Sequence, residues 1–187
     1  ILLVSDEVIC GFGRTGRWFG CEHFGTRPDL MPIAKAMSSG YLPIGGLMVA
    51  DRVAEVLIDK GGEFAHGFTW SGHPAACAVS VACLDIMRRE KVVERVRDEL
   101  AGYFAAKWRS LAEHPLVGET RSLGLLGALE LVPARGDDVF QPMPAVRDTM
   151  IVAPPLVITP AEIDELVRRI GLALDQTASL VARERWV

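Results

Sequence analysis

The chain has 187 residues, of which 50% are hydrophobic, and it carries a formal net charge of −4 at pH 7. This length and apolar content suffice for a sizeable buried core. The slightly acidic balance, without any basic block, argues against a nucleic-acid partner. No apolar run approaches the roughly 20 residues of a membrane-spanning helix. We therefore expect a cytoplasmic protein that acts on small molecules.

The four cysteines are irregularly spaced and form no C-x-x-C pair. This pattern predicts neither a zinc site nor a disulfide framework, so we expect buried thiols and no metal. The chain also opens on Ile1 to Val4, an apolar strand-like run without an initiator Met. We expect that sequence belonging upstream is absent.

The first quarter of the chain alternates apolar runs with glycine-bearing loops. Residues 1–10 are typical of a strand buried on both faces of a parallel sheet. Residues 11–25 contain five glycines among aromatic residues, which predicts an ordered loop. Further strands are expected over 30–35 and 44–50.

The rest of the chain shows clearer helical signals. A short helix is expected over 52–60, and Pro74 begins a long helical pattern that runs to about Glu113. A strand follows over 123–132. Thr159-Pro160-Ala161-Glu162 has the composition of a helix start, with a cap, a proline and an acid. Alternating strands and helices indicate the α/β class.

Residues 11–16, GFGRTG, match the G-x-G-x-x-G pattern directly after a strand. A dinucleotide site also needs a helix that opens at these glycines. The residues that follow, RWFGC, have no helical period. We therefore set the dinucleotide interpretation aside.

Asp6 and Lys35 each lie toward the end of an apolar strand. A carboxylate buried there needs a cationic partner, although Asp6 could instead pair with Arg14 or cap the next turn. A lysine in desolvated surroundings is neutral part of the time and is a nucleophile suited to an aldehyde. Alternatively, Lys35 could simply extend its amine to the surface.

Four stretches together carry a family resemblance. In this order they are SDEVICGFGRTG, PDLMPIAKAMSSGY, GFTWSGHP and PPLVIT. They resemble the class III, or omega, aminotransferases of the fold type I pyridoxal-phosphate enzymes, and they extend over nearly the whole chain.

The resemblance implies a pyridoxal 5'-phosphate site with named roles. Lys35 would carry the cofactor as a Schiff base and then act as the general base. Asp6 would hold the protonated pyridine nitrogen, and Val8 would pack on the ring face. Thr69 would donate to the cofactor phosphate of the neighbouring subunit, which implies a homodimer with the active site at the interface.

The resemblance also implies the domain organisation. Residues 1–84 would form the carboxyl-terminal part of the large domain, a mostly parallel sheet with helices. Residues 85–187 would form a smaller α+β domain, shortened around 133–147. The amino-terminal half of the family, including its phosphate cup, is missing. Pro144 stands where the family usually has its carboxylate-binding arginine, which leaves Arg147 as the candidate for keto-acid binding.

The expected activity is transamination from an amine or amino acid to a keto acid. Aminomutases and decarboxylases of the same family share the Asp6, Lys35 and Thr69 pattern. The alternative to an enzyme is a catalytically inactive, truncated remnant of one. The missing half and Pro144 favour that alternative.

Overall fold

The computed structural model describes residues 1–132 and 149–184. It divides into two compact units, Ile1–Glu94 and Arg95–Val187. The assignment of such units to a large and a small domain with a division at residue 84 stays a prediction. Among the described residues, no helix has the length and apolar character required to cross a membrane.

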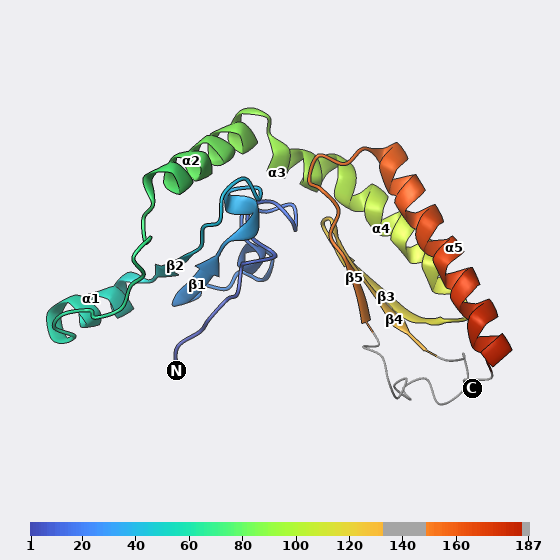
Figure 1. The fold of residues 1–187 in the computed structure, drawn as a ribbon, viewed down its shortest axis with the longest axis horizontal. Helices are drawn as coiled ribbons and strands as arrows, with labels where there is room; N and C mark the ends of the chain where they lie inside the picture. The colour runs from blue at the N-terminus through green and yellow to red at the C-terminus, as the bar shows by residue number, and fades with distance from the viewer. Residues whose placement is uncertain (133–148, 185–187) are drawn as a thin grey trace. The chain divides into compact units, whose positions relative to one another are not determined.

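The first unit is organised around strand β1 (Leu30–Ile33), which has a neighbour on each side (Figure 1). Strand β2 (Gly46–Val49) pairs with it antiparallel. The amino-terminal segment pairs with it in parallel through a bridge between Val4 and Leu30. The parallel pairing of the first residues was expected, but their burial was not observed, because Ile1 to Val4 are all exposed.

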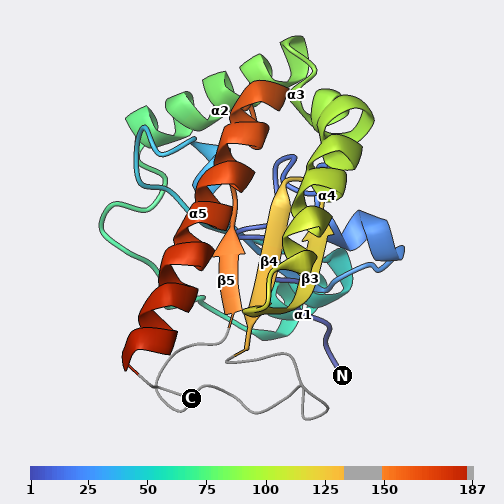
Figure 2. The ribbon, with the colours of Figure 1, turned by 90° about the vertical axis from the view of Figure 1, so that its right-hand side faces the viewer.

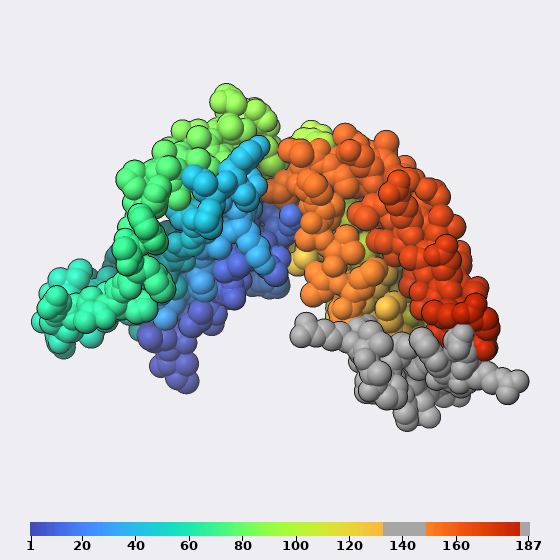
Figure 3. All heavy atoms as spheres, viewed as in Figure 1, coloured from blue at the N-terminus to red at the C-terminus, as the bar shows by residue number. Residues whose placement is uncertain are grey.

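Two helices of the first unit differ in how they pack. Helix α2 (Pro74–Arg89) begins at its proline, as expected, and buries the stripe Ala76, Ser80, Cys83 and Met87 at helical spacing. Helix α1 (Asp51–Lys60) has no fully buried residue, and only Val53 and Ala54 are half-buried. Its atoms and those of the loop that follows lie at the surface in the space-filling view (Figure 3).

The continuous helix expected from Pro74 to Glu113 is broken into pieces. Helix α2 ends at Arg89, and Lys91 adopts a left-handed conformation with φ of 51°. A left-handed residue cannot continue an α-helix, so the chain changes direction there. The pieces that follow are α3 (Val92–Arg95), the π-helical turn η3 (Val96–Leu100), α4 (Ala101–Ser110) and the 3-10 turn η4 (Leu111–Glu113).

The second unit contains a three-stranded antiparallel sheet in the order β3, β4, β5. Its strands are β3 (Val117–Leu123), β4 (Leu126–Leu131) and β5 (Thr149–Val152). Helices α4 and α5 (Pro160–Glu184) lie side by side across one face of this sheet (Figure 2). The strand expected over 123–132 contains β4, whereas β3 was not foreseen.

The core of the second unit lies between this sheet and its two helices. Phe104 and Trp108 of α4 are fully buried and stack with ring centroids 5.3 Å apart. The Trp108 indole donates its Nε1–H to the Ala128 carbonyl oxygen at 3.1 Å, and its ring lies over Gly127 of β4. A buried indole N–H needs such a partner.

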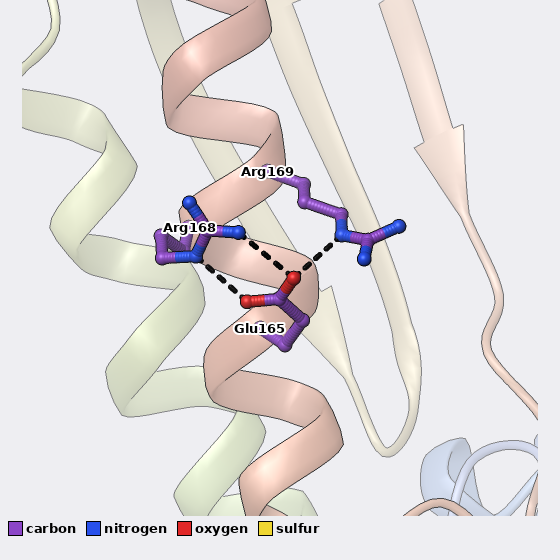
Figure 4. Close-up of polar contacts among 3 residues, drawn as sticks. All are labelled: Glu165, Arg168 and Arg169. Carbon is purple, nitrogen blue, oxygen red and sulfur yellow. Dashed lines mark hydrogen bonds and ion pairs between the residues drawn. The ribbon is translucent and has the colours of Figure 1, made fainter.

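Helix α5 begins with the capping box that the sequence predicts. The Thr159 hydroxyl accepts the Glu162 N–H at 3.3 Å, and the Glu162 carboxylate accepts the Thr159 N–H at 2.8 Å. One turn on, the Glu165 carboxylate accepts bonds from Arg168 and Arg169, each as short as 2.7 Å (Figure 4). The two guanidinium groups lower the pKa of Glu165 to about 2.

Candidate functional site

Asp6 lies in the segment that pairs with β1, and its side chain is exposed. Its Oδ1 accepts the backbone N–H of Val8 at 3.0 Å, so the carboxylate caps the turn that follows. Capping the next turn was one of the alternatives to a cofactor-binding role for Asp6. The burial expected of this carboxylate is not seen among the described residues. Because the group is exposed, its other oxygen can still accept a bond from a ligand. Val8, the residue it caps, is partly buried.

Lys35 follows β1 after a single residue and opens the 3-10 turn η2 (Lys35–Met37). Its φ of 46° lies in the left-handed region, which costs a non-glycine residue about 1–3 kcal/mol. The side chain is exposed, so the desolvation expected at this strand end is not provided by the described residues. Phe12, Ser39 and Lys91 also adopt a left-handed conformation, so this backbone geometry is shared with residues outside the candidate site.

Hydrogen bonds from the turns after Lys35 hold this conformation. The Ser38 N–H donates to the Lys35 carbonyl oxygen at 3.2 Å, and the Tyr41 N–H donates to the Ser38 carbonyl oxygen at 3.0 Å. The Ser38 hydroxyl is buried and donates to the Leu42 carbonyl oxygen at 2.7 Å. The lysine backbone is thus fixed even though its side chain is free to reach a ligand.

Parallel pairing brings the Asp6 and Lys35 segments to the same end of two neighbouring strands. The Ser5 N–H donates to the Leu30 carbonyl oxygen and the Glu7 N–H donates to the Pro32 carbonyl oxygen, both at 3.0 Å. Parallel strands end at the same edge of a sheet, which is where ligands bind in open α/β folds.

Thr69 lies in the exposed loop 61–73. It is a central residue of the turn from Phe68 to Ser71, whose ends are joined by the Ser71 N–H to the Phe68 carbonyl oxygen at 2.9 Å. Phe68 and Trp70 on either side are both 77% exposed. Nearby is a pocket of about 370 Å³ within the first unit. It is lined by Pro43, Ile44, Gly45, Phe68, Trp70, Ser71, Gly72, His73 and Ala76.

Glu7 is a buried carboxylate next to Asp6 that was not predicted from the sequence. It is only 1% exposed. Its Oε2 accepts the Gly20 N–H at 2.7 Å, and its Oε1 accepts the Cys21 N–H at 2.7 Å and the Ser5 hydroxyl at 3.1 Å. The alternation of side chains along a strand could have indicated a second, differently placed acid, because adjacent acids in a strand point to opposite sides.

The glycine-rich loop folds tightly around Glu7. A Cβ at Gly20 would lie 2.9 Å from the Cys10 Cβ and 3.2 Å from the Glu7 Oε2, so only glycine fits there. Burial, and then the negative charge of Glu7, raise the pKa of the Cys10 and Cys21 thiols. Such thiols are poor nucleophiles. The expectation that the cysteines are buried holds only for Cys83, because Cys10 and Cys21 are half-buried and Cys77 is exposed.

Two further expectations concern other parts of the site. Arg147, the candidate for keto-acid binding, and Pro144 lie outside the described residues. Within the described ranges, no group of three or more His, Cys, Asp or Glu side chains is arranged to hold a metal ion.

Solved structures that match this fold include transaminases. The chain superimposes on the omega transaminase from Pseudomonas jessenii in complex with PMP with a TM-score of 0.88 and 36% identity, covering 97% of this chain and 45% of that one. An (S)-enantioselective omega-transaminase from Thermomicrobium roseum matches with a TM-score of 0.83 and 39% identity, covering 94% and 43%. The fold is therefore part of the fold type I architecture of pyridoxal-phosphate transaminases, as the resemblance implied.

Sequence relatives narrow the class to a family. The family model described as aminotransferase class-III matches residues 1–174. The putrescine–pyruvate aminotransferase of Pseudomonas aeruginosa is 50% identical over 97% of this chain and 43% of its own length. Gamma aminobutyrate transaminase 1 of Solanum lycopersicum is 38% identical over 97% and 39%. The chain belongs to the class III aminotransferases.

The chain spans less than half the length of these relatives. Class III aminotransferases use pyridoxal phosphate, and the Pseudomonas jessenii structure contains its amino form.

Proposed function

We propose that this chain contributes the lysine, the ring-nitrogen carboxylate and one phosphate ligand to a pyridoxal-phosphate-dependent aminotransferase. The observation that carries the proposal is the parallel pairing of the Asp6 segment with β1, the strand that leads directly into Lys35. Both side chains are exposed at the same end of the two strands.

The residues at this edge fit the polar ends of the cofactor. The Asp6 carboxylate is an acceptor that would hold a protonated pyridine nitrogen by a charge-assisted bond. The Lys35 amine would bind the aldehyde carbon and, once released, would move the proton at the substrate carbon. Val8, two residues after Asp6, would pack on the ring face. When bound, the cofactor supplies an electron sink for the carbanion that this proton transfer leaves behind.

Thr69 would serve a second copy of the chain. Its hydroxyl lies in an exposed, glycine-bearing turn, which suits a phosphate ligand. The flanking rings of Phe68 and Trp70 are 77% exposed, as expected of aromatic anchors that a partner covers. We infer a homodimer in which each subunit provides Thr69 to the cofactor phosphate of the other.

Among substrates, we propose a primary amine at the end of an aliphatic chain as donor and a small keto acid as acceptor. The names of the putrescine–pyruvate and gamma aminobutyrate relatives share this donor chemistry. Aminomutase or decarboxylase activity of the same family would need only a different fate of the bound substrate.

A second candidate is a chain that binds the cofactor without turning over. The exposure of Asp6 and Lys35 favours it, because both groups act best when water is excluded.

Borohydride trapping tests the cofactor assignment. The chain is mixed with pyridoxal phosphate, reduced, digested and analysed by mass spectrometry, with Lys35→Ala and the exposed Lys60→Ala as matched variants. We expect the cofactor mass on the Lys35 peptide in the wild type and in Lys60→Ala. Its absence from that peptide, or equal labelling of many lysines, would contradict the proposal.

Turnover of a diamine with pyruvate then separates the two candidates. Formation of alanine in a reaction that needs Lys35 supports the aminotransferase. Labelling of Lys35 without alanine formation supports the chain that only binds. With an amino acid in place of the diamine, release of carbon dioxide or formation of an isomeric amino acid would identify one of the other family reactions.

A further inference from the structure

A buried carboxylate lies one residue from the one assigned to the cofactor. The Glu7 side chain accepts three hydrogen bonds, and its backbone N–H donates to Pro32 of β1 at 3.0 Å while its carbonyl oxygen accepts the Gly11 N–H at 2.8 Å. Every polar group of this residue is therefore engaged. The partners lie in four separate segments: Ser5 in the Asp6 segment, Gly11 in the loop that follows, Pro32 near the end of β1, and Gly20 and Cys21 at the start of the 3-10 turn η1 (Gly20–Phe24).

We propose that Glu7 is a positioning residue that fixes Asp6 relative to Lys35. The inference rests on the proposed function and goes beyond it by assigning a role to a residue that would not touch the cofactor. Because side chains alternate along an extended segment, anchoring Glu7 on one side directs Asp6 to the other. The anchor is bonded to β1 close to the end of that strand, so it links both halves of the site.

The exposure of Asp6 makes such an anchor necessary. The Asp6 carboxylate faces solvent, and its own hydrogen bond to Val8 is local to one turn. Nothing in that single bond sets its distance from Lys35. The buried hydrogen bonds of Glu7 set this distance, because short hydrogen bonds to a charged acceptor are stronger than bonds between neutral groups.

Glu22 offers a matched control in the same loop. Its carboxylate also accepts a backbone N–H, that of Phe19 at 2.9 Å, but it is exposed and bonds only within its own turn. Replacing it by Gln should leave the Asp6 strand in place. In Glu7→Gln the amide NH₂ would face the N–H of Gly20 or Cys21, and two donors cannot pair.

The test measures the cofactor's pyridine nitrogen directly. The chain is loaded with ¹⁵N-pyridine-labelled pyridoxal phosphate, and the ¹⁵N resonance and the dissociation constant are compared in wild type, Glu7→Gln and Glu22→Gln. We expect a protonated nitrogen in the wild type and in Glu22→Gln. In Glu7→Gln the resonance should move toward the neutral form and the dissociation constant should rise on the order of 10- to 100-fold, as expected when a reacting group is misplaced. Borohydride should still label Lys35 at saturating cofactor.

A second readout needs no cofactor. Amide hydrogen exchange at Val8, which donates to Asp6, should be faster in Glu7→Gln than in Glu22→Gln. If Glu7→Gln does not fold, Ser5→Ala tests the positioning role instead, because it removes the Ser5 hydroxyl donor and leaves the Glu7 carboxylate in place. It should shift the ¹⁵N resonance in the same direction by a smaller amount.

Three outcomes overturn the proposal or what it rests on. A folded Glu7→Gln whose ¹⁵N resonance and dissociation constant match the wild type refutes the positioning role alone. So does an unchanged resonance in Ser5→Ala when Glu7→Gln is unfolded. A wild-type chain that is not labelled at Lys35 refutes the proposed function, and the positioning role fails with it.

Discussion

Replacing Gly127 by alanine would place a methyl group inside the indole of Trp108. A Cβ at Gly127 would lie 2.6 Å from the Trp108 Cε2 and 2.9 Å from its Cδ2 and Cζ2. The indole is 1% exposed, stacks on Phe104 and is held by its bond to Ala128, so it cannot move aside without losing these contacts. The strand or the ring must shift.

The expected cost follows from that overlap. Adding a methyl group to a packed core destabilises by about 1–3 kcal/mol when neighbours are forced off their preferred positions. Replacing glycine by alanine also stabilises the folded chain by about 0.4–1 kcal/mol, because it lowers the entropy of the unfolded chain. Since the Trp108 ring is fixed on both sides, we expect a net loss of about 1–2 kcal/mol.

Gly102 provides a control of opposite sign. It lies within α4, and a Cβ there would meet no atom within 4 Å. Gly102→Ala should therefore stabilise by about 0.5–1 kcal/mol, because alanine loses less backbone freedom in a helix.

Urea unfolding followed by far-UV circular dichroism compares the two variants. Hydrogen exchange of the β3 to β5 amides then locates the effect in the second unit. Gly127→Ala should lower the midpoint and speed exchange in β4, while Gly102→Ala raises the midpoint. A Gly127→Ala variant as stable as the wild type would refute the inference that the Trp108 ring is held in place.

Three further outcomes are expected. Thr159→Ala removes the capping box of α5 and should cost about 1 kcal/mol in urea unfolding, with faster amide exchange at Glu162; unchanged exchange would show that the cap is not formed. The Glu165 carboxyl should titrate near pH 2 when followed by NMR. Because its pKa is lowered in the folded protein, its ion pairs stabilise α5 at pH values above the ordinary carboxyl pKa, and this stabilisation is lost as the pH falls through about 2. A titration midpoint near 4.5 would contradict the pairing. Arg147→Ala should weaken keto-acid binding in an active protein, and an unchanged affinity would remove Arg147 from the site.

Signals that are local in the sequence predicted the structure well. Pro74 begins α2, and Thr159 with Glu162 caps α5, because a proline or a capping side chain acts on the residues directly beside it. The break at Lys91 was missed for the complementary reason. No glycine or proline marks it, and a left-handed lysine is held there by the surrounding structure.

Features that depend on distant segments were not predictable. Strand β3 is largely polar, and it becomes a strand through its pairing with β4. Asp6 and Glu7 are equivalent candidates in the sequence, and the one that is buried is decided by the loop that folds back to Gly20 and Cys21. The roles of Asp6, Val8, Lys35 and Thr69 came from a resemblance and remain proposals.

The neighbouring acids at positions 6 and 7 place opposite demands on side-chain length. Position 7 fills a closed space whose donors are fixed, whereas position 6 is exposed and, in the role proposed for it, must span the distance to a ligand. Shortening Glu7 or lengthening Asp6 would preserve the charge and still harm the protein, for different reasons. In a library of variants, the double substitution Asp6→Glu with Glu7→Asp, which only exchanges the order of the two acids, should therefore be rejected as firmly as the loss of either one.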